Sequence, residues 1–147
     1  MFFTARELIN EGVVPTVALA FRNESLVIMK EDFEKIGCRV FVSTDDGSEG
    51  YKGYAKDLCQ NLMQKEQFSS VALCGPLMMM KTVCPIAIEK NIACYASLEE
   101  CMGCGVGACL ACVCNIEDQN AAEGFHRERV CVEGPVFDAS KIVWSEV

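Results

Sequence analysis

Four cysteines near the carboxyl end restrict the fold of this chain more than any other feature. Cys104, Cys109 and Cys112 follow the spacing C-x4-C-x2-C, and Cys131 lies further along the chain. This is the ligand spacing of a plant-type [2Fe-2S] cluster, in which a short loop supplies three thiolates and a second segment supplies the fourth. We therefore predict that these four cysteines bind such a cluster.

Two glycines lie inside the first ligand loop. Gly105 and Gly107 can adopt positive φ, which lets the main chain turn inward and approach the inorganic core. Two further cysteines, Cys101 and Cys114, flank the motif, and the sequence leaves their role open. We prefer the ligand set that begins with Cys104 because it keeps both glycines inside the first loop.

A zinc-stabilised protein-interaction module is the alternative hypothesis. Zinc sites usually pair thiols as C-x2-4-C in two separated knuckles, and the pairs Cys109/Cys112 and Cys101/Cys104 have that spacing. A Rieske centre is excluded, because it needs two histidines and the chain has only His126. We expect that histidine to be solvated in a polar loop.

Composition narrows the partners and the compartment. The chain has 147 residues, is 51% hydrophobic and carries a formal net charge of −8, which argues against a nucleic-acid partner. Arg6 and Glu7 interrupt the amino-terminal apolar residues before a signal peptide can form. The longest apolar stretch, residues 13–21, is far too short to span a membrane. We expect a cytoplasmic protein that forms an oligomer or a hetero-complex, with eleven cysteines kept reduced.

Strand and helix patterns alternate through residues 1–96. We predict strands at residues 15–21, 39–43, 70–74 and 91–96 and helices at residues 4–11, 30–36 and 54–64 and after Gly75-Pro76. This alternation indicates βαβ units on a parallel sheet, hence an α/β fold. We expect residues 1–96 to form a partial nucleotide-binding domain.

The pattern changes after Ser97, where glycine and cysteine dominate. We expect residues 97–147 to form a small cluster-binding domain with two short strands at residues 113–116 and 129–132. The polar residues 117–126 would form the loop between them, and residues 133–147 a tail.

Three strand ends carry residues suited to a nucleotide, because ligands of α/β sheets bind at the carboxyl ends of the strands. Asp45 or Asp46 could accept a ribose hydroxyl and would repel a 2′-phosphate, which favours NAD over NADP. Taken singly, ordinary turn chemistry also explains each strand end. The predicted cofactor-binding residues are Arg22, Thr44, Asp45, Cys74, Gly75, Pro76 and Met79.

Several motifs together resemble a known family. The segment Cys74-Gly75-Pro76-Leu77-Met78-Met79 is similar to the C-G-P-x-x-M motif of the ferredoxin–NAD(P) reductase superfamily, where it borders the nicotinamide. With the Thr44–Gly47 turn, the cysteine motif and the Arg129–Phe137 segment, the chain resembles the electron-transfer subunit of class 1B dihydroorotate dehydrogenase. The resemblance implies an FAD, a [2Fe-2S] cluster and electron transfer between an FMN-containing catalytic subunit and NAD, in pyrimidine biosynthesis.

A related family and one departure qualify these expectations. The chain is also similar to the small subunit of NADH-dependent ferredoxin–NADP oxidoreductase, which typically has aspartate in place of the first cluster cysteine, so that Cys104 favours the dihydroorotate type. Members of the family begin with a flavin-binding barrel and a Gly-rich loop, and this chain begins inside the helix after that loop. We expect a truncated piece, or a partner that supplies the rest. The chain alone should not bind FAD, should bind NAD only partially and should have no acid–base catalysis.

Overall fold

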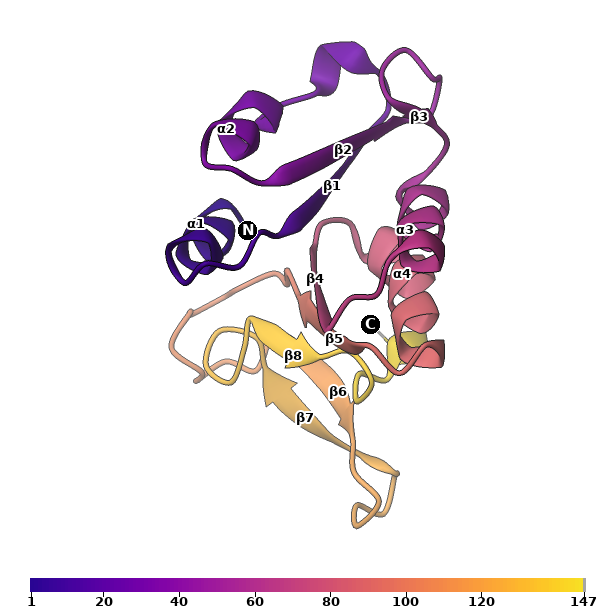
Figure 1. The fold of residues 1–147 in the computed structure, drawn as a ribbon. Coiled ribbons are helices and arrows are strands. Elements are labelled where there is room, and N and C mark those ends of the chain that lie inside the picture. The colour runs from indigo at the N-terminus through magenta and orange to yellow at the C-terminus, as the bar shows by residue number, and fades with distance from the viewer. Residues whose placement is uncertain (147) are drawn as a thin grey trace. The chain divides into compact units, whose positions relative to one another are not determined.

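The computed structural model describes residues 1–146. The chain folds as two compact units, Met1–Glu66 and Gln67–Val147, whose elements are labelled in Figure 1. The domain boundary expected near residue 97 separates two sequence patterns and stays a prediction. Within the described residues, no helix is long and apolar enough to cross a membrane.

The first unit contains the predicted alternation of helices and strands. Strand β1 pairs with β2 in parallel from Thr16↔Arg39 to Phe21↔Thr44, and β2 pairs in parallel with the short β3. Gly37, with φ of 95°, allows the chain to leave the second helix and enter β2. The elements are α1 (Phe2–Asn10), β1 (Thr16–Phe21), the 3-10 helix η1 (Glu24–Leu26), α2 (Lys30–Lys35), β2 (Arg39–Thr44), β3 (Tyr51–Lys52) and α3 (Ala55–Lys65).

Apolar side chains from α1, α2 and the parallel strands form the core of this unit. Ala5, Phe33 and Cys38 are buried at its centre. The ring of Phe2 meets that of Phe33 edge-on, with 5.2 Å between the centroids. Burying one such aromatic side chain contributes about 1.5–3 kcal/mol. The partly buried residues packed around the centre are Phe2, Ile9, Val17, Leu19, Ile36 and Val40.

The second unit begins with another parallel pair, which runs from Ser70↔Ala93 to Cys74↔Ser97. The helix between the two strands packs against the second of them. Its buried side chains are Met80, Val83, Cys84 and Ala87. The elements are β4 (Ser70–Cys74), α4 (Leu77–Glu89), β5 (Ala93–Ser97), β6 (Val113–Glu117), β7 (Phe125–Arg129), β8 (Val136–Asp138) and the 3-10 helix η2 (Trp144–Glu146).

Strand β8 returns the chain to this sheet. It pairs antiparallel with β5, with Ser97 opposite Val136, and the Leu98 N–H donates to the Pro135 carbonyl at 2.9 Å. The prediction that residues 133–147 form only a tail was therefore wrong. Residues 98–135 leave the sheet and re-enter it at neighbouring positions.

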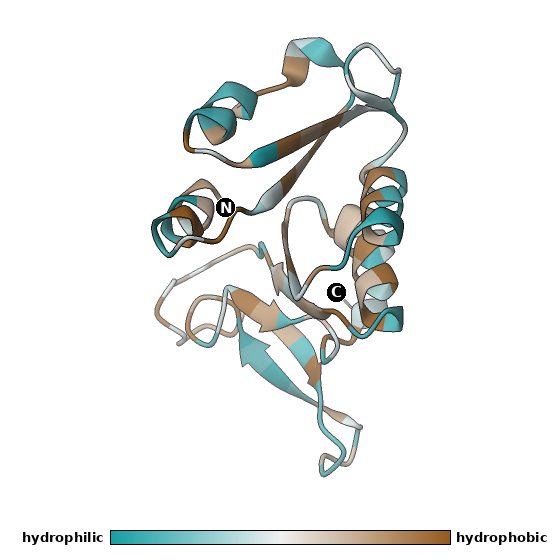
Figure 2. Ribbon diagram, viewed as in Figure 1, coloured by the Kyte–Doolittle hydropathy of each residue, from teal (hydrophilic) through white to brown (hydrophobic). Residues whose placement is uncertain are grey.

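A β-hairpin formed by β6 and β7 lies within residues 98–135. Its second strand differs from the prediction. Strand β7 pairs antiparallel with β6, from Val113↔Arg129 to Glu117↔Phe125, so the predicted strand at residues 129–132 was wrong. After β7 the chain turns, because the N–H groups of Val132 and Glu133 both donate to the Arg129 carbonyl. The polarity of β7, visible in Figure 2, had suggested a loop.

Candidate metal centre

The loop between Cys104 and Cys112 has almost no regular structure. Gly105 and Gly107 have φ of 70° and 81°, the left-handed conformation that glycine adopts without strain. Leu110 has φ of 58°, which costs free energy in a residue with a side chain. These turns fold the backbone back on itself, so that its N–H groups face inward.

The sulfur of Cys104 accepts hydrogen bonds from these N–H groups. The donors are Val106 at 3.4 Å, Ala108 at 3.3 Å and Cys109 at 3.4 Å. These backbone N–H groups, led by that of Val106 and aided by the Cys109 thiol, lower the pKa of Cys104 to about 6. A concave array of backbone N–H groups of this kind favours an anion, here a thiolate.

Cys112 and Cys131 form a second sulfur pair. Cys112 is 3% exposed, and its thiol hydrogen-bonds with that of Cys131, which raises the pKa of Cys131. Burial raises that pKa further, and a hydrogen bond from the Gly107 N–H partly offsets the increase. The Val130 N–H donates to the Cys112 carbonyl at 2.8 Å, which holds the turn that carries Cys131 beside β6.

The predicted ligands thus come together as two pairs. Cys104 contacts Cys109 through a thiol hydrogen bond, and Cys104 also interacts electrostatically with Cys131. Among residues 1–146, no three His, Cys, Asp or Glu side chains gather as a single metal ion would need. Two thiol pairs suit a two-iron core, in which each iron takes two thiolates besides the bridging sulfides. The donor set fits a [2Fe-2S] cluster, and the ligand assignment stays a prediction.

The two surplus cysteines lie in different surroundings. Cys114 is 2% exposed within β6, and burial raises its pKa to about 11. Its environment is that of a small core residue. Cys101 is exposed ahead of the loop.

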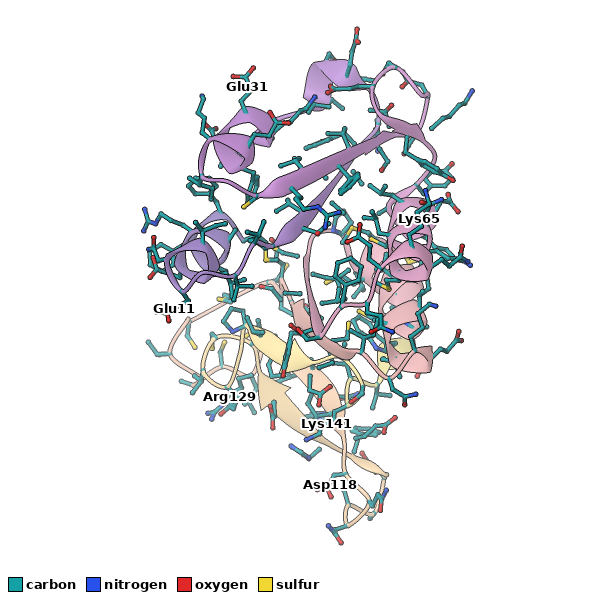
Figure 3. All side chains as sticks on the ribbon, in the orientation of Figure 1. Glu11, Glu31, Lys65, Asp118, Arg129 and Lys141 are labelled. Atoms are coloured by element: carbon teal, nitrogen blue, oxygen red, sulfur yellow. The ribbon has the colours of Figure 1, made fainter. Side chains whose placement is uncertain are left out.

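Arg129 links the loop to the segment that carries Cys131. At the end of β7, where Figure 3 labels it, it donates from an Nη atom to the Gly107 carbonyl at 3.1 Å. Its Nε donates to Glu133 at 2.9 Å, its second Nη forms a further bond to the same carboxylate, and Arg129 lowers the pKa of Glu133 to about 2. Sequence reasoning assigned Arg129 no role, and no local signal marks its contact with Gly107, which lies 22 residues earlier.

In the first unit, the predicted nucleotide residues Arg22, Thr44 and Asp45 gather at the carboxyl ends of β1 and β2. The Asp45 N–H donates to the Phe21 carbonyl at 3.1 Å. The Thr44 hydroxyl donates to the Glu49 carbonyl and accepts from the Glu49 N–H, at 2.7 and 3.0 Å. Thr44 therefore closes a turn, whereas the side chains of Arg22 and Asp45 are exposed.

The other predicted nucleotide residues form one turn of the second unit, between β4 and α4. Gly75 has φ of 150°, and a Cβ there would lie 3.1 Å from the terminal methyl of Met79. Cys74 is exposed, and Pro76 is the N-cap of α4 without a side-chain hydrogen bond. This turn presents open backbone at a helix N-terminus, a position that favours a negatively charged group.

His126 lies in β7 and not in a loop as expected. Its ring nitrogens approach Asp118 at 3.4 Å and Glu128 at 3.0 Å. The Glu128 hydrogen bond, with the negative charges of both carboxylates, raises the pKa of His126. The ring is about half exposed, which agrees with the expectation that it is solvated.

Comparisons with known proteins agree with this geometry. Residues 99–143 match the iron-sulfur cluster binding domain of dihydroorotate dehydrogenase B. The chain is 35% identical over 143 residues to the electron transfer subunit of dihydroorotate dehydrogenase B (NAD(+)) from Geobacillus sp. (strain WCH70), covering 97% of this chain and 52% of that subunit. The corresponding subunit of Caldanaerobacter subterraneus subsp. tengcongensis is 38% identical over 128 residues, with 87% and 49% covered.

A solved structure of an NADH-dependent reduced ferredoxin-NADP oxidoreductase, studied for flavin-based electron bifurcation, has the same fold. It superimposes with a TM-score of 0.80 at 29% identity and covers 98% of this chain and 49% of the other. The chain spans about half the length of these relatives. The predicted α/β fold of ferredoxin reductase type, followed by a cysteine-rich domain, is confirmed. The chain is similar along nearly its whole length to the electron transfer subunits of dihydroorotate dehydrogenase B, and its residues 99–143 match the model of their iron-sulfur cluster binding domain.

Proposed function

We propose that this chain is an electron-transfer protein that holds a [2Fe-2S] cluster on Cys104, Cys109, Cys112 and Cys131. The observation that carries the proposal is the Cys104 sulfur, which accepts hydrogen bonds from Val106, Ala108 and Cys109. Hydrogen bonds to sulfur stabilise the thiolate that iron requires and are a main determinant of cluster potential. When bound, such a cluster accepts and releases one electron at a time.

The chain's own residues supply three things to this function. The Cys104/Cys109 and Cys112/Cys131 pairs provide the anionic ligands. The inward N–H groups of the loop compensate their negative charge, since fixed backbone dipoles do this without reorganisation. The buried position of Cys112 shields one side of the site from water, whereas the exposed Cys104 side leaves a short path for an electron.

The relatives suggest the two redox partners. We propose that electrons pass between a flavoprotein catalytic subunit of the dihydroorotate dehydrogenase type and NAD, as the names of the relatives indicate. Each unit carries its own candidates for nucleotide contact, the strand ends at Arg22 and Asp45 in the first and the turn at Gly75 and Pro76 in the second. The resemblance to this family also implies FAD, and we propose that this chain does not bind FAD on its own. The eleven free thiols suit a reducing cytoplasm.

A second candidate partner system follows from the solved relative, an NADH-dependent reduced ferredoxin-NADP oxidoreductase. Both candidates place the same electron carrier between flavin and nicotinamide. Reduction of the loaded chain by a dihydroorotate dehydrogenase catalytic subunit with dihydroorotate, compared with reduction by reduced ferredoxin, distinguishes them.

The cluster itself is tested on anaerobically purified chain reconstituted with ferrous iron and sulfide. We expect about two iron and two acid-labile sulfide per chain, a brown visible spectrum and, after dithionite reduction, an electron paramagnetic resonance signal from one unpaired electron. Colourless protein that binds one zinc ion per chain would instead support the zinc-stabilised interaction module and reject the electron-transfer proposal.

A further inference from the structure

Arg129 touches both segments that carry the predicted ligands. It stands two residues before Cys131 in the sequence, and its guanidinium donates to the Gly107 carbonyl inside the loop between Cys104 and Cys109. Because the peptide group is planar, holding the Gly107 carbonyl also fixes the direction of the N–H group in the same peptide plane. Arg129 therefore joins one thiol pair to the other through a single side chain.

Glu133 fixes the direction of the guanidinium. Its carboxylate accepts hydrogen bonds from the Arg129 N–H at 2.6 Å and from the Arg129 Nε at 2.9 Å. A further bond joins it to the second Nη of Arg129. A bidentate pair of this kind is directional, and the remaining Nη donates to the Gly107 carbonyl.

The space at Gly107 shows how close this contact is. A Cβ built on Gly107 would lie 3.0 Å from the Nη of Arg129 and 2.8 Å from a methyl of Val132. The loop backbone thus lies directly against the turn that carries Cys131. The same residue receives the arginine on its carbonyl, and its N–H opposes the rise in the pKa of Cys131.

We propose that Arg129 is a positioning residue that holds the loop against the Cys112/Cys131 pair and raises the reduction potential of the cluster. The inference rests on the proposed function. By fixing the Gly107 carbonyl, Arg129 orients the neighbouring loop N–H groups toward sulfur. Its positive charge beside the site stabilises the reduced cluster, which carries one more negative charge than the oxidised one.

The test compares Arg129→Gln with Arg127→Gln in the reconstituted full chain. Arg127 is the matched control because it lies two residues away on β7 and lines the same surface pocket. Each variant loses one positive charge. We expect Arg129→Gln to lower the midpoint potential, to change the electron paramagnetic resonance g-values and to speed cluster loss to a chelator about 10-fold to 100-fold. Arg127→Gln should change the potential only slightly and leave the g-values and the loss rate unchanged.

Two further variants separate charge from position. Arg129→Lys keeps the charge but cannot bond Gly107 and Glu133 in the same fork, so it should keep most of the potential and still lose the cluster quickly. Glu133→Gln keeps Arg129 but removes the carboxylate that orients its guanidinium. This variant should also speed cluster loss. Far-ultraviolet circular dichroism of each metal-free variant verifies that the chain still folds, and if Arg129→Gln does not fold, the other two variants decide.

The outcomes distinguish this inference from the proposed function. Wild-type chain that takes up no iron and sulfide rejects the proposed function and the inference with it. Wild-type chain that loads a cluster, with Arg129→Gln matching Arg127→Gln in potential, g-values and loss rate, rejects only the role of Arg129.

Discussion

The buried cysteines of the α/β elements and the exposed cysteine at the start of the ligand loop differ in what surrounds their sulfur atoms. Burial raises the pKa of Cys38, and it raises that of Cys59 to about 11. At Cys104 the surrounding N–H groups lower the pKa to about 6. One residue type thus has opposite chemistry in the two regions, since apolar packing disfavours the thiolate and aligned N–H groups favour it.

The comparison shows that cysteine number alone says little about function. The helix cysteine Cys59 has the surroundings of an ordinary small apolar residue, whereas Cys104 lies in a loop whose backbone conformation requires glycine at two positions. The cysteine spacing, together with the glycines between the cysteines, is the sequence feature that predicted the ligand loop containing Cys104.

The largest expected effect is cluster loss when a cysteine of the ligand loop is replaced. Replacing Cys104 by serine removes a proposed iron ligand, and we expect iron content to fall at least about 10-fold. Cys101→Ser is the matched control, because Cys101 is also exposed and lies only three residues away. Iron and sulfide analysis with visible spectra measures both. Cluster loss in Cys101→Ser with retention in Cys104→Ser would reverse the assignment.

Alkylation of the metal-free chain should follow the same division. At pH 7 a thiol with a pKa of about 6 is mostly thiolate, whereas one with a pKa of about 11 is about 0.01% thiolate. Allowing for its weaker intrinsic nucleophilicity, Cys104 should react with iodoacetamide on the order of 50-fold faster than Cys59. Peptide mass spectrometry over time measures the rates, and the Cys104 rate should rise with pH only up to about pH 6–7. Equal rates would remove the distinction.

A buried cysteine should influence stability instead of the cluster. Cys84 on α4 is 0% exposed, and its thiol hydrogen-bonds with that of Cys94. Cys84→Ser therefore exchanges a sulfur for a smaller and more polar hydroxyl in the interior, with an expected cost of about 1–3 kcal/mol. Urea unfolding of the metal-free chain measures the loss, and Cys84→Ala is the control without a polar atom. Iron content after reconstitution should equal that of the wild type. An iron loss as large as that of Cys104→Ser would contradict the division.

The smallest effect concerns His126, the titrating group of the exposed hairpin. The pKa of His126 is raised in the folded state, mainly by its hydrogen bond with Glu128. The imidazolium therefore stabilises the hairpin fully below about pH 6.5, the unfolded value, and this contribution is lost as pH rises through the folded pKa. The stability difference between wild type and His126→Gln should shrink over that range, measured by melting temperature. A difference that grows with pH would contradict it.

The sequence predicted the regular part of the fold well and the irregular part unevenly. The apolar run at Thr16–Phe21 and the helical spacing of α3 are local signals, and the structure has both elements there. Strand β7 was misplaced because its polar residues face water in a two-stranded hairpin, where no hydrophobic alternation is required. Strand β8 was missed because three residues are too few for a pattern and their partner, β5, is distant in sequence.

The sequence could predict those parts of the candidate site that depend on the local spacing of residues. Cysteine positions and the two glycines sufficed for the proposed ligand loop, because ligand geometry constrains them within a few residues. The contact from Arg129 to Gly107 joins residues far apart in sequence, and no local pattern announces it. Thr44 carries a turn signal, and its hydroxyl closes a turn onto Glu49; its contact with a nucleotide stays a prediction.

The pairing of Ser97 with Val136 has a consequence for anyone who dissects this protein. A fragment cut to begin at residue 97 would keep all four proposed ligands but would deprive β8 of the backbone partners it has in β5, and Phe137 would lose its place opposite Ala96. The two ends of residues 98–135 would then no longer be held together by the pairing of β5 with β8. Cluster retention should therefore depend on residues 93–96, which contain none of the proposed ligands and which such a fragment lacks.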